Sequence, residues 1–85
     1  MTFGEARTIL DGYADNHLSG TDKTSFKAAV AVIADGESSQ SAMDAAQVTI
    51  NTFVELQSET NVFDAADKFA ETVNPNSPNY PHRPH

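Results

Sequence analysis

Carboxylates and histidines are the side chains of this sequence that could act as acids, bases or metal ligands. Asp64 and Asp67 have the spacing that places two carboxylates on one helix face. Acids in a first helical turn are also expected for structural reasons, because they face the positive end of the helix dipole. His82 and His85 are three residues apart, and an extended proline-rich backbone would separate them by roughly 9 Å, too far to share a metal ion.

The motifs that most often carry catalysis are missing from the sequence. It has no Cys for a nucleophile or a thiolate metal site, no Gly-rich phosphate loop and no HExxH motif. Its many serines fall at expected helix starts and on polar helix faces, where Ser is common for structural reasons. We therefore expect a protein that is not an enzyme and that uses no cofactor or metal.

Acidic residues dominate the charge, with 12 Asp and Glu against 5 Lys and Arg and a formal net charge of -7. The span from Ala28 to Asp67 contains no cation. Such a surface repels nucleic-acid phosphates and attracts basic proteins, so the expected partner is a protein, and direct nucleic-acid binding is not expected. The acids that we expect to form a partner-binding face are Asp35, Glu37, Asp44, Glu55 and Glu59.

The end of the chain, residues 74–85, has proline at every third position. A polyproline II helix has three residues per turn, so these prolines would line one edge of an extended segment. Such a segment could dock into an aromatic groove of a partner or along a neighbouring subunit, or it could be a disordered, solubilising terminus. The residues that we expect to make contacts in this tail are Pro75, Pro78, Tyr80, Pro81, Arg83 and Pro84.

Hydrophobic periodicity predicts the elements that must position these residues. Apolar side chains recur at helical spacing in four stretches, and no stretch alternates as a strand would. The fold class predicted is all-α, a compact bundle of four helices followed by a polyproline-type tail. The predicted helical domain spans residues 1–73 and the tail 74–85, and the helices span about 2–18, 21–35, 38–58 and 61–73.

Local signals mark the ends of these helices. Thr2 and Glu5 have capping-box spacing, and Gly36 is well placed for a left-handed residue after the second helix. Ser19-Gly20 is expected to stop the first helix, after which Thr21 or Asp22 caps the second. The third helix is expected to be capped by Ser38 or Ser39.

Two of the predicted helices have informative faces. The helix at 21–35 is apolar nearly all round, which predicts a central position with neighbours on several sides. On the helix at 38–58, Gln47 and Asn51 fall on the polar half, and Val48 is the one large apolar residue outside the apolar arc. The apolar half of that helix comprises Ala42, Met43, Ala45, Ala46, Ile50, Phe53, Val54 and Leu56.

Residues 31–56 also resemble part of a helix-turn-helix motif. Val48 stands where such motifs have an apolar turn residue, and Thr49 would begin the second helix. Gln47 departs from the pattern, because glycine normally makes the turn, and the span from Thr49 to Glu59 offers no cation for phosphates. The resemblance implies, as an alternative, a degenerate helix-turn-helix regulator.

No window of the sequence approaches the roughly 18 apolar residues of a membrane span, and the start does not resemble a signal peptide. We therefore expect a cytoplasmic protein, or a virion protein if a phage encodes it. The function expected is a non-enzymatic protein interaction, by a partner or by self-association, as in a phage or mobile-element accessory or virion component. A second alternative is an acidic nucleic-acid mimic that inhibits a basic host protein.

Overall fold

The computed structural model describes residues 1–36, 38–55 and 60–73, and in these ranges the chain forms four α-helices and no strand. The predicted all-α class and the number of helices are confirmed. The predicted tail at 74–85 lies outside the described residues. In chain order the helices are α1 (Phe3–His17), α2 (Gly20–Asp35), α3 (Gln40–Val54) and α4 (Thr60–Val73).

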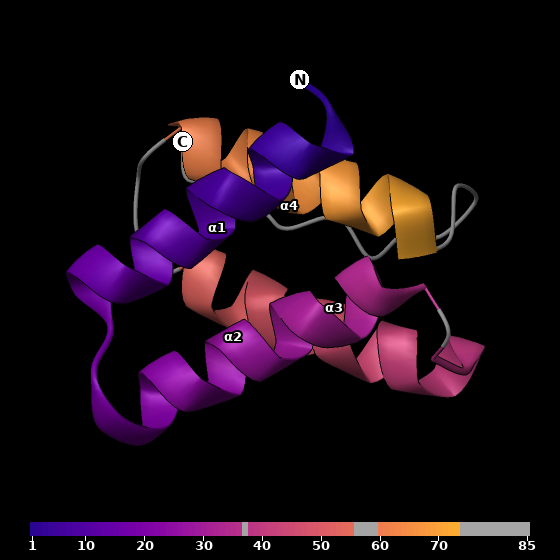
Figure 1. Cartoon of the computed structure of the whole chain (residues 1–85), viewed down its shortest axis with the longest axis horizontal. Coiled ribbons are helices and arrows are strands. Elements are labelled where there is room, and N and C mark those ends of the chain that lie inside the picture. The colour runs from indigo at the N-terminus through magenta and orange to yellow at the C-terminus, as the bar shows by residue number, and fades with distance from the viewer. Residues whose placement is uncertain (37, 56–59, 74–85) are drawn as a thin grey trace.

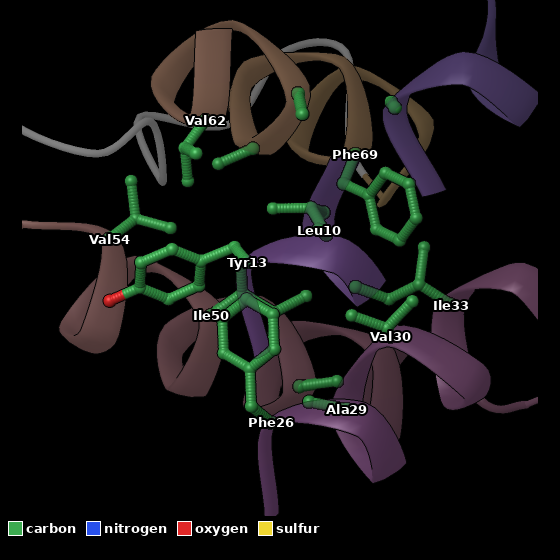
Figure 2. Packing of buried hydrophobic residues seen from close by; sticks show 14 of the residues in the cluster. Leu10, Tyr13, Phe26, Ala29, Val30, Ile33, Ile50, Val54, Val62 and Phe69 are labelled. Atoms are coloured by element: carbon green, nitrogen blue, oxygen red, sulfur yellow. The ribbon is translucent and has the colours of Figure 1, made fainter. Parts of the chain in front are cut away.

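The helices form two layers, with α1 beside α4 and α2 beside α3 (Figure 1). α1 also contacts α2, and α3 contacts α4, whereas α1 and α3 lie diagonally across the bundle. The hydrophobic core lies between the layers, as Figure 2 shows. Its largest fully buried side chains include Leu10, Phe26, Ile33, Ile50, Phe63 and Phe69.

Aromatic contacts join helices both between the two layers and within each layer. The ring centroids of Tyr13 and Phe26 are 5.5 Å apart, and the Tyr13 hydroxyl donates to the backbone carbonyl of Phe53 at 3.4 Å. Phe26 and Phe53 meet edge to face at 5.8 Å. Near the chain start, Phe3 stacks on Phe69 at 4.4 Å and joins α1 to α4. Such pairs stabilise by about 0.5–1.5 kcal/mol each beyond the burial of their area.

Most helix ends follow the predicted local signals. The Thr2 hydroxyl accepts from the Glu5 amide at 3.1 Å, and the Glu5 carboxylate accepts from the Thr2 amide at 3.0 Å, which completes the capping box. Gly36 ends α2 with a φ of 73°, and Ser39 caps α3 by accepting from the Ala42 amide at 3.2 Å. These caps accept hydrogen bonds from backbone amides of the first turn, which have no partner within the helix. Glycine adopts the positive φ at the end of α2 without steric strain.

The start of α2 differs from its prediction. Ser19 is the N-cap and Gly20 is the first helical residue, so the cap predicted at Thr21 or Asp22 is wrong by two or three positions. Gly20 has a φ of 58°, a conformation that glycine adopts without steric cost. The turn between α1 and α2 therefore keeps the expected length of two residues but lies one position earlier, at Leu18 and Ser19, because the glycine that was expected to stop α1 already belongs to the next helix.

The buried face of α3 also differs from its prediction. Gln47 and Asn51, predicted on the polar half, have exposed fractions of 0% and 9%, whereas Ala42 and Ala45 of the predicted apolar half are exposed. Gln47 Nε2 donates to Asn51 Oδ1 at 2.7 Å and to the backbone carbonyl of Ala66 in α4 at 3.2 Å. Burial of a polar amide is tolerated when its donors are satisfied in this way.

α2 is less enclosed than its composition predicts. Ala28 and Ala31 are exposed and Val32 is half-buried, so an apolar side of this helix faces solvent. α2 packs against α1 and α3 but hardly against α4. A hollow of about 540 Å³ lies over this side, and its lining includes Ala31, Val32 and Asp35.

The helix-turn-helix interpretation is wrong at its turn. α3 continues without a break through the residues where that turn was expected. The hydroxyls of Thr49 and Thr52 donate to the carbonyls of Ala45 and Val48 at 3.2 and 2.8 Å, bonds that span one helical turn. Gln47, which stands in the place of the expected glycine, is instead buried against α4.

Substitutions of Gln47 should separate the effect of charge from that of shape. Gln47→Glu places a carboxylate in the core, so we expect the free energy of unfolding at pH 7 to fall by about 3 kcal/mol or more. The loss should shrink at acidic pH, where the carboxyl group is protonated. Gln47→Met keeps the volume and introduces no charge, but it removes the donor to Asn51 Oδ1 and to the Ala66 carbonyl, so a loss of about 1–3 kcal/mol that does not depend on pH is expected. Urea unfolding measures both, and equal losses in the two variants would contradict this account.

Candidate functional site

Three of the five acids predicted to form a partner-binding face lie within the described residues. Asp35 is the last residue of α2, Asp44 lies in the second turn of α3, and Glu55 is the C-cap of α3. Glu37 and Glu59 lie outside the described residues, as does the whole tail. The structural description of this face therefore rests on the first three.

These three acids do not form one cluster. α2 and α3 are antiparallel (Figure 1), so Asp35 and Asp44 belong to the end where 36–39 joins the helices, and Glu55 belongs to the opposite end. Asp44 and Glu55 are three helical turns apart, which places them on one edge of α3 about 16 Å apart along its axis. We call this line of α3 the acidic edge.

The outward face of α3 beside the acidic edge is uncharged. Val48 has an exposed fraction of 55%, which confirms its predicted place outside the buried arc. Small or uncharged side chains surround it, so α3 presents a mildly apolar strip flanked by carboxylates. The other exposed residues of this strip are Ser41, Ala45 and Thr52.

Acids occupy the ends of α2 and α3 where bases would be stabilising. Asp35 closes α2, Glu55 caps α3, and neither helix has a basic residue in its last turn. The C-terminal end of a helix carries a partial negative charge, so an acid there is unfavourable by about 0.3–1 kcal/mol at low ionic strength. Positions that break a local stability rule are where function, rather than folding, is expected to determine the residue.

Gln40 connects the acidic edge to the end of α4. Its Nε2 donates to Asp44 Oδ1 at 2.9 Å and to the backbone carbonyl of Val73 at 2.9 Å. The chain therefore leaves α4 beside the first turns of α3. Sequence reasoning missed this link, because it joins residues 33 positions apart and no local pattern announces it.

The cations of the described residues form ion pairs elsewhere. Asp15 of α1 accepts from Lys27 Nζ at 2.6 Å and from Lys23 Nζ at 3.3 Å, both from α2. These two hydrogen bonds lower the pKa of the Asp15 carboxyl, and the bond from Lys27 has the larger effect. The bond between Lys27 and Asp15 also raises the pKa of Lys27. Further ion pairs join Arg7 to Asp11 at 3.9 Å and Lys68 to Glu71 at 3.7 Å.

The part of the chain that the structure describes contains neither a metal-binding cluster nor a membrane-spanning helix. No three His, Asp or Glu side chains of residues 1–36, 38–55 and 60–73 gather closely enough to hold a metal ion. No helix in these ranges has the length and hydropathy to cross a bilayer.

The fold defines an all-α helical bundle. Comparison of the chain with protein-family models, with curated proteins and with solved structures gives no match.

The two ends of α2 offer a matched test of the helix-dipole argument. Asp35→Asn should raise the free energy of unfolding by about 0.3–1 kcal/mol, because it removes a carboxylate from the negative end of the helix. Asp22→Asn, in the first turn of the same helix, should lower it by a similar amount. Thermal unfolding at low ionic strength measures both, and the difference should shrink in about 1 M salt. Changes of the same sign in the two variants would contradict the argument.

Asp15 should contribute stability that depends on pH. Its pKa is lowered by folding, so the contribution is present above the ordinary value of 3.8 and is lost as the pH falls through the lowered value. Asp15→Asn should therefore reduce the unfolding temperature at pH 7, modestly because the pair is exposed, and the two curves should converge at acidic pH. Asp11→Asn is the matched control and should change less, because its partner Arg7 is 3.9 Å away. A constant gap down to about pH 2 would exclude the ion pair as the cause.

Proposed function

We propose that this chain is a non-enzymatic protein that works by binding another protein, either a foreign partner or a second copy of itself. The contact surfaces are the acidic edge of α3 and the tail at 74–85. The small, acidic, cysteine-free composition fits an accessory or virion component of a phage or mobile element. The observation that carries the proposal is the presence of acids at the ends of both α2 and α3, with no base in either last turn.

Charge supports a basic partner surface. No Lys or Arg lies between Ala28 and Asp67, so nothing in this span would repel a cationic surface laid against α3. The partial negative charges of the helix ends add to the carboxylates of Asp35 and Glu55. Val48, exposed beside the acidic edge, would supply apolar area of the kind found in the centre of an interface.

The link through Gln40 supports joint use of both surfaces. It places the end of α4, where the tail begins, within one side chain of Asp44. A partner held by the tail would thus meet α3 at a high effective concentration, and two weak contacts could give strong binding. This arrangement makes loss of either surface costly to binding.

A second candidate is a mimic of nucleic acid that occupies a basic groove of a host protein. The carboxylates of Asp44 and Glu55, in line along one edge of α3, favour it, because a row of negative charges resembles a phosphate backbone in its field. Its binding should weaken steeply with salt and should not need the tail, whereas the first candidate uses both the acidic edge and the tail. Truncation after Val73 therefore separates the two candidates, because only the first should lose binding.

Neutralising Asp35 of α2 together with the acidic edge of α3 should strongly reduce capture of the partner. The full chain, immobilised, is incubated with an extract of the cells that make it, and retained proteins are identified. We expect a variant without the three acids to retain at least about tenfold less partner, since rim and interface charges steer and hold basic surfaces. The variant without the three acids carries Asp35→Asn, Asp44→Asn and Glu55→Gln. Light scattering on the full chain and on a version ending at Val73 shows whether the partner is a second copy.

A control variant has the same net charge as the variant without the three acids, but it leaves Asp35 and the acidic edge intact. It should retain the partner as the parent chain does. The proposal is wrong if the control and the acidic-edge variant lose the partner equally, because the effect is then one of net charge alone. It is also wrong if the full chain is monomeric and retains no partner. The control carries Asp22→Asn, Asp64→Asn and Glu71→Gln, all at exposed positions.

A further inference from the structure

Gly12 lies in the interior of α1 without any reason that folding supplies. Its backbone is not in the left-handed region, unlike that of Gly20 and Gly36. A Cβ atom at this position would meet nothing within 4 Å, so no close approach of another element requires glycine. Glycine destabilises a helix interior relative to alanine. Alanine would therefore fit at position 12 and would make the helix more stable. The presence of glycine instead points to a role for the space above it.

That space is a hollow of about 220 Å³ between the second half of α1 and the first turn of α4. Gly12 lines it together with Ile9 and with Val62, which is buried. The hollow is smaller than the roughly 300 Å³ at which sites for drug-sized ligands begin, so it suits a single ring. A helical glycine offers a flat backbone surface on which the face of a ring can lie.

Two carboxamides from different helices line the hollow. Asn16 comes from α1 and Asn61 from α4, and both are exposed. Neither side chain makes a hydrogen bond to another described residue, so each amide keeps a donor and an acceptor for a ligand. His17, Thr8 and Tyr13 also line the hollow, and the rings of His17 and Tyr13 lie 5.3 Å apart. No Asp, Glu, Lys or Arg lines the hollow.

We propose that this hollow binds a small, uncharged, planar molecule that carries an amide group. The ring lies over Gly12 and Ile9, and its amide exchanges hydrogen bonds with Asn16 and Asn61. A charged ligand is disfavoured, because no Asp or Glu lines the hollow to pair with a cation and no Lys or Arg lines it to pair with an anion, and the chain's net charge of -7 also repels anions. The site is separate from the acidic edge and does not depend on the function proposed above.

The test uses nicotinamide as the probe and the full chain labelled with nitrogen-15. Titration followed by NMR should shift the backbone signals of Gly12 and the side-chain amide signals of Asn16 and Asn61. Nicotinate has the same ring with a carboxylate in place of the amide. It should bind at least about tenfold more weakly, because it lacks the amide donor and is repelled by the acidic chain.

A pair of variants tests the role of Gly12. Gly12→Ala should raise the unfolding temperature, because alanine favours the helix and meets no neighbour, yet it should weaken nicotinamide binding about tenfold or more by filling the hollow. Gly4→Ala is the matched control in the same helix, where a Cβ would approach only the Thr2 hydroxyl, at 3.9 Å. It should leave binding unchanged.

Three results would overturn the proposal. The first is that nicotinamide at about 100 mM leaves the signals of Gly12, Asn16 and Asn61 unmoved, since even a weak single-ring ligand should then bind. The second is that Gly12→Ala binds nicotinamide as well as the parent chain does. The third is that nicotinate binds as tightly as nicotinamide, because recognition would then not involve the amide.

Discussion

The contacts of Tyr13 hold the two layers of the bundle in register. This one side chain of α1 packs on Phe26 of α2 and donates its hydroxyl to the carbonyl of Phe53 in α3. α1 and α3 are diagonal in the bundle, so the hydroxyl bridges helices whose backbones do not approach each other. The chain has no Cys, and a domain of this size without disulfides depends on such packing. Tyr13 also lines the hollow over Gly12, so the side chain that connects the two layers helps to shape that surface as well.

Local features of the fold could be predicted from the sequence, and features that depend on distant contacts could not. The capping box of Thr2 and Glu5 and the left-handed Gly36 involve residues close in sequence, so the pattern sufficed. The burial of Gln47 was mispredicted, because hydropathy places an amide outside, whereas the Ala66 carbonyl, 19 residues away, satisfies one of its donors inside. The outward side of α3 consequently includes Ala42 and Ala45, which the helical wheel had assigned to the apolar half.

For the candidate surfaces too, the sequence identified residues but not the arrangement that depends on contacts between distant parts of the chain. Charge counting identified Asp35, Asp44 and Glu55, but their separation into two ends follows from the antiparallel packing of α2 and α3, which composition does not encode. The hollow over Gly12 was missed, although its signal was present in the sequence as a glycine in the middle of the helix predicted at 2–18. The predicted contacts in 74–85 lie outside the described residues and stay predictions.

The bond from Gln40 to the carbonyl of Val73 has a mechanical consequence. The last carbonyls of a helix have no partner within it, so a terminal turn usually frays first under tension. Here the final carbonyl of α4 is held by a side chain of α3. A pull on the chain beyond Val73 must break this contact with another helix before α4 can unwind from its end. The domain would thus resist force at the terminus by which a partner would grip it.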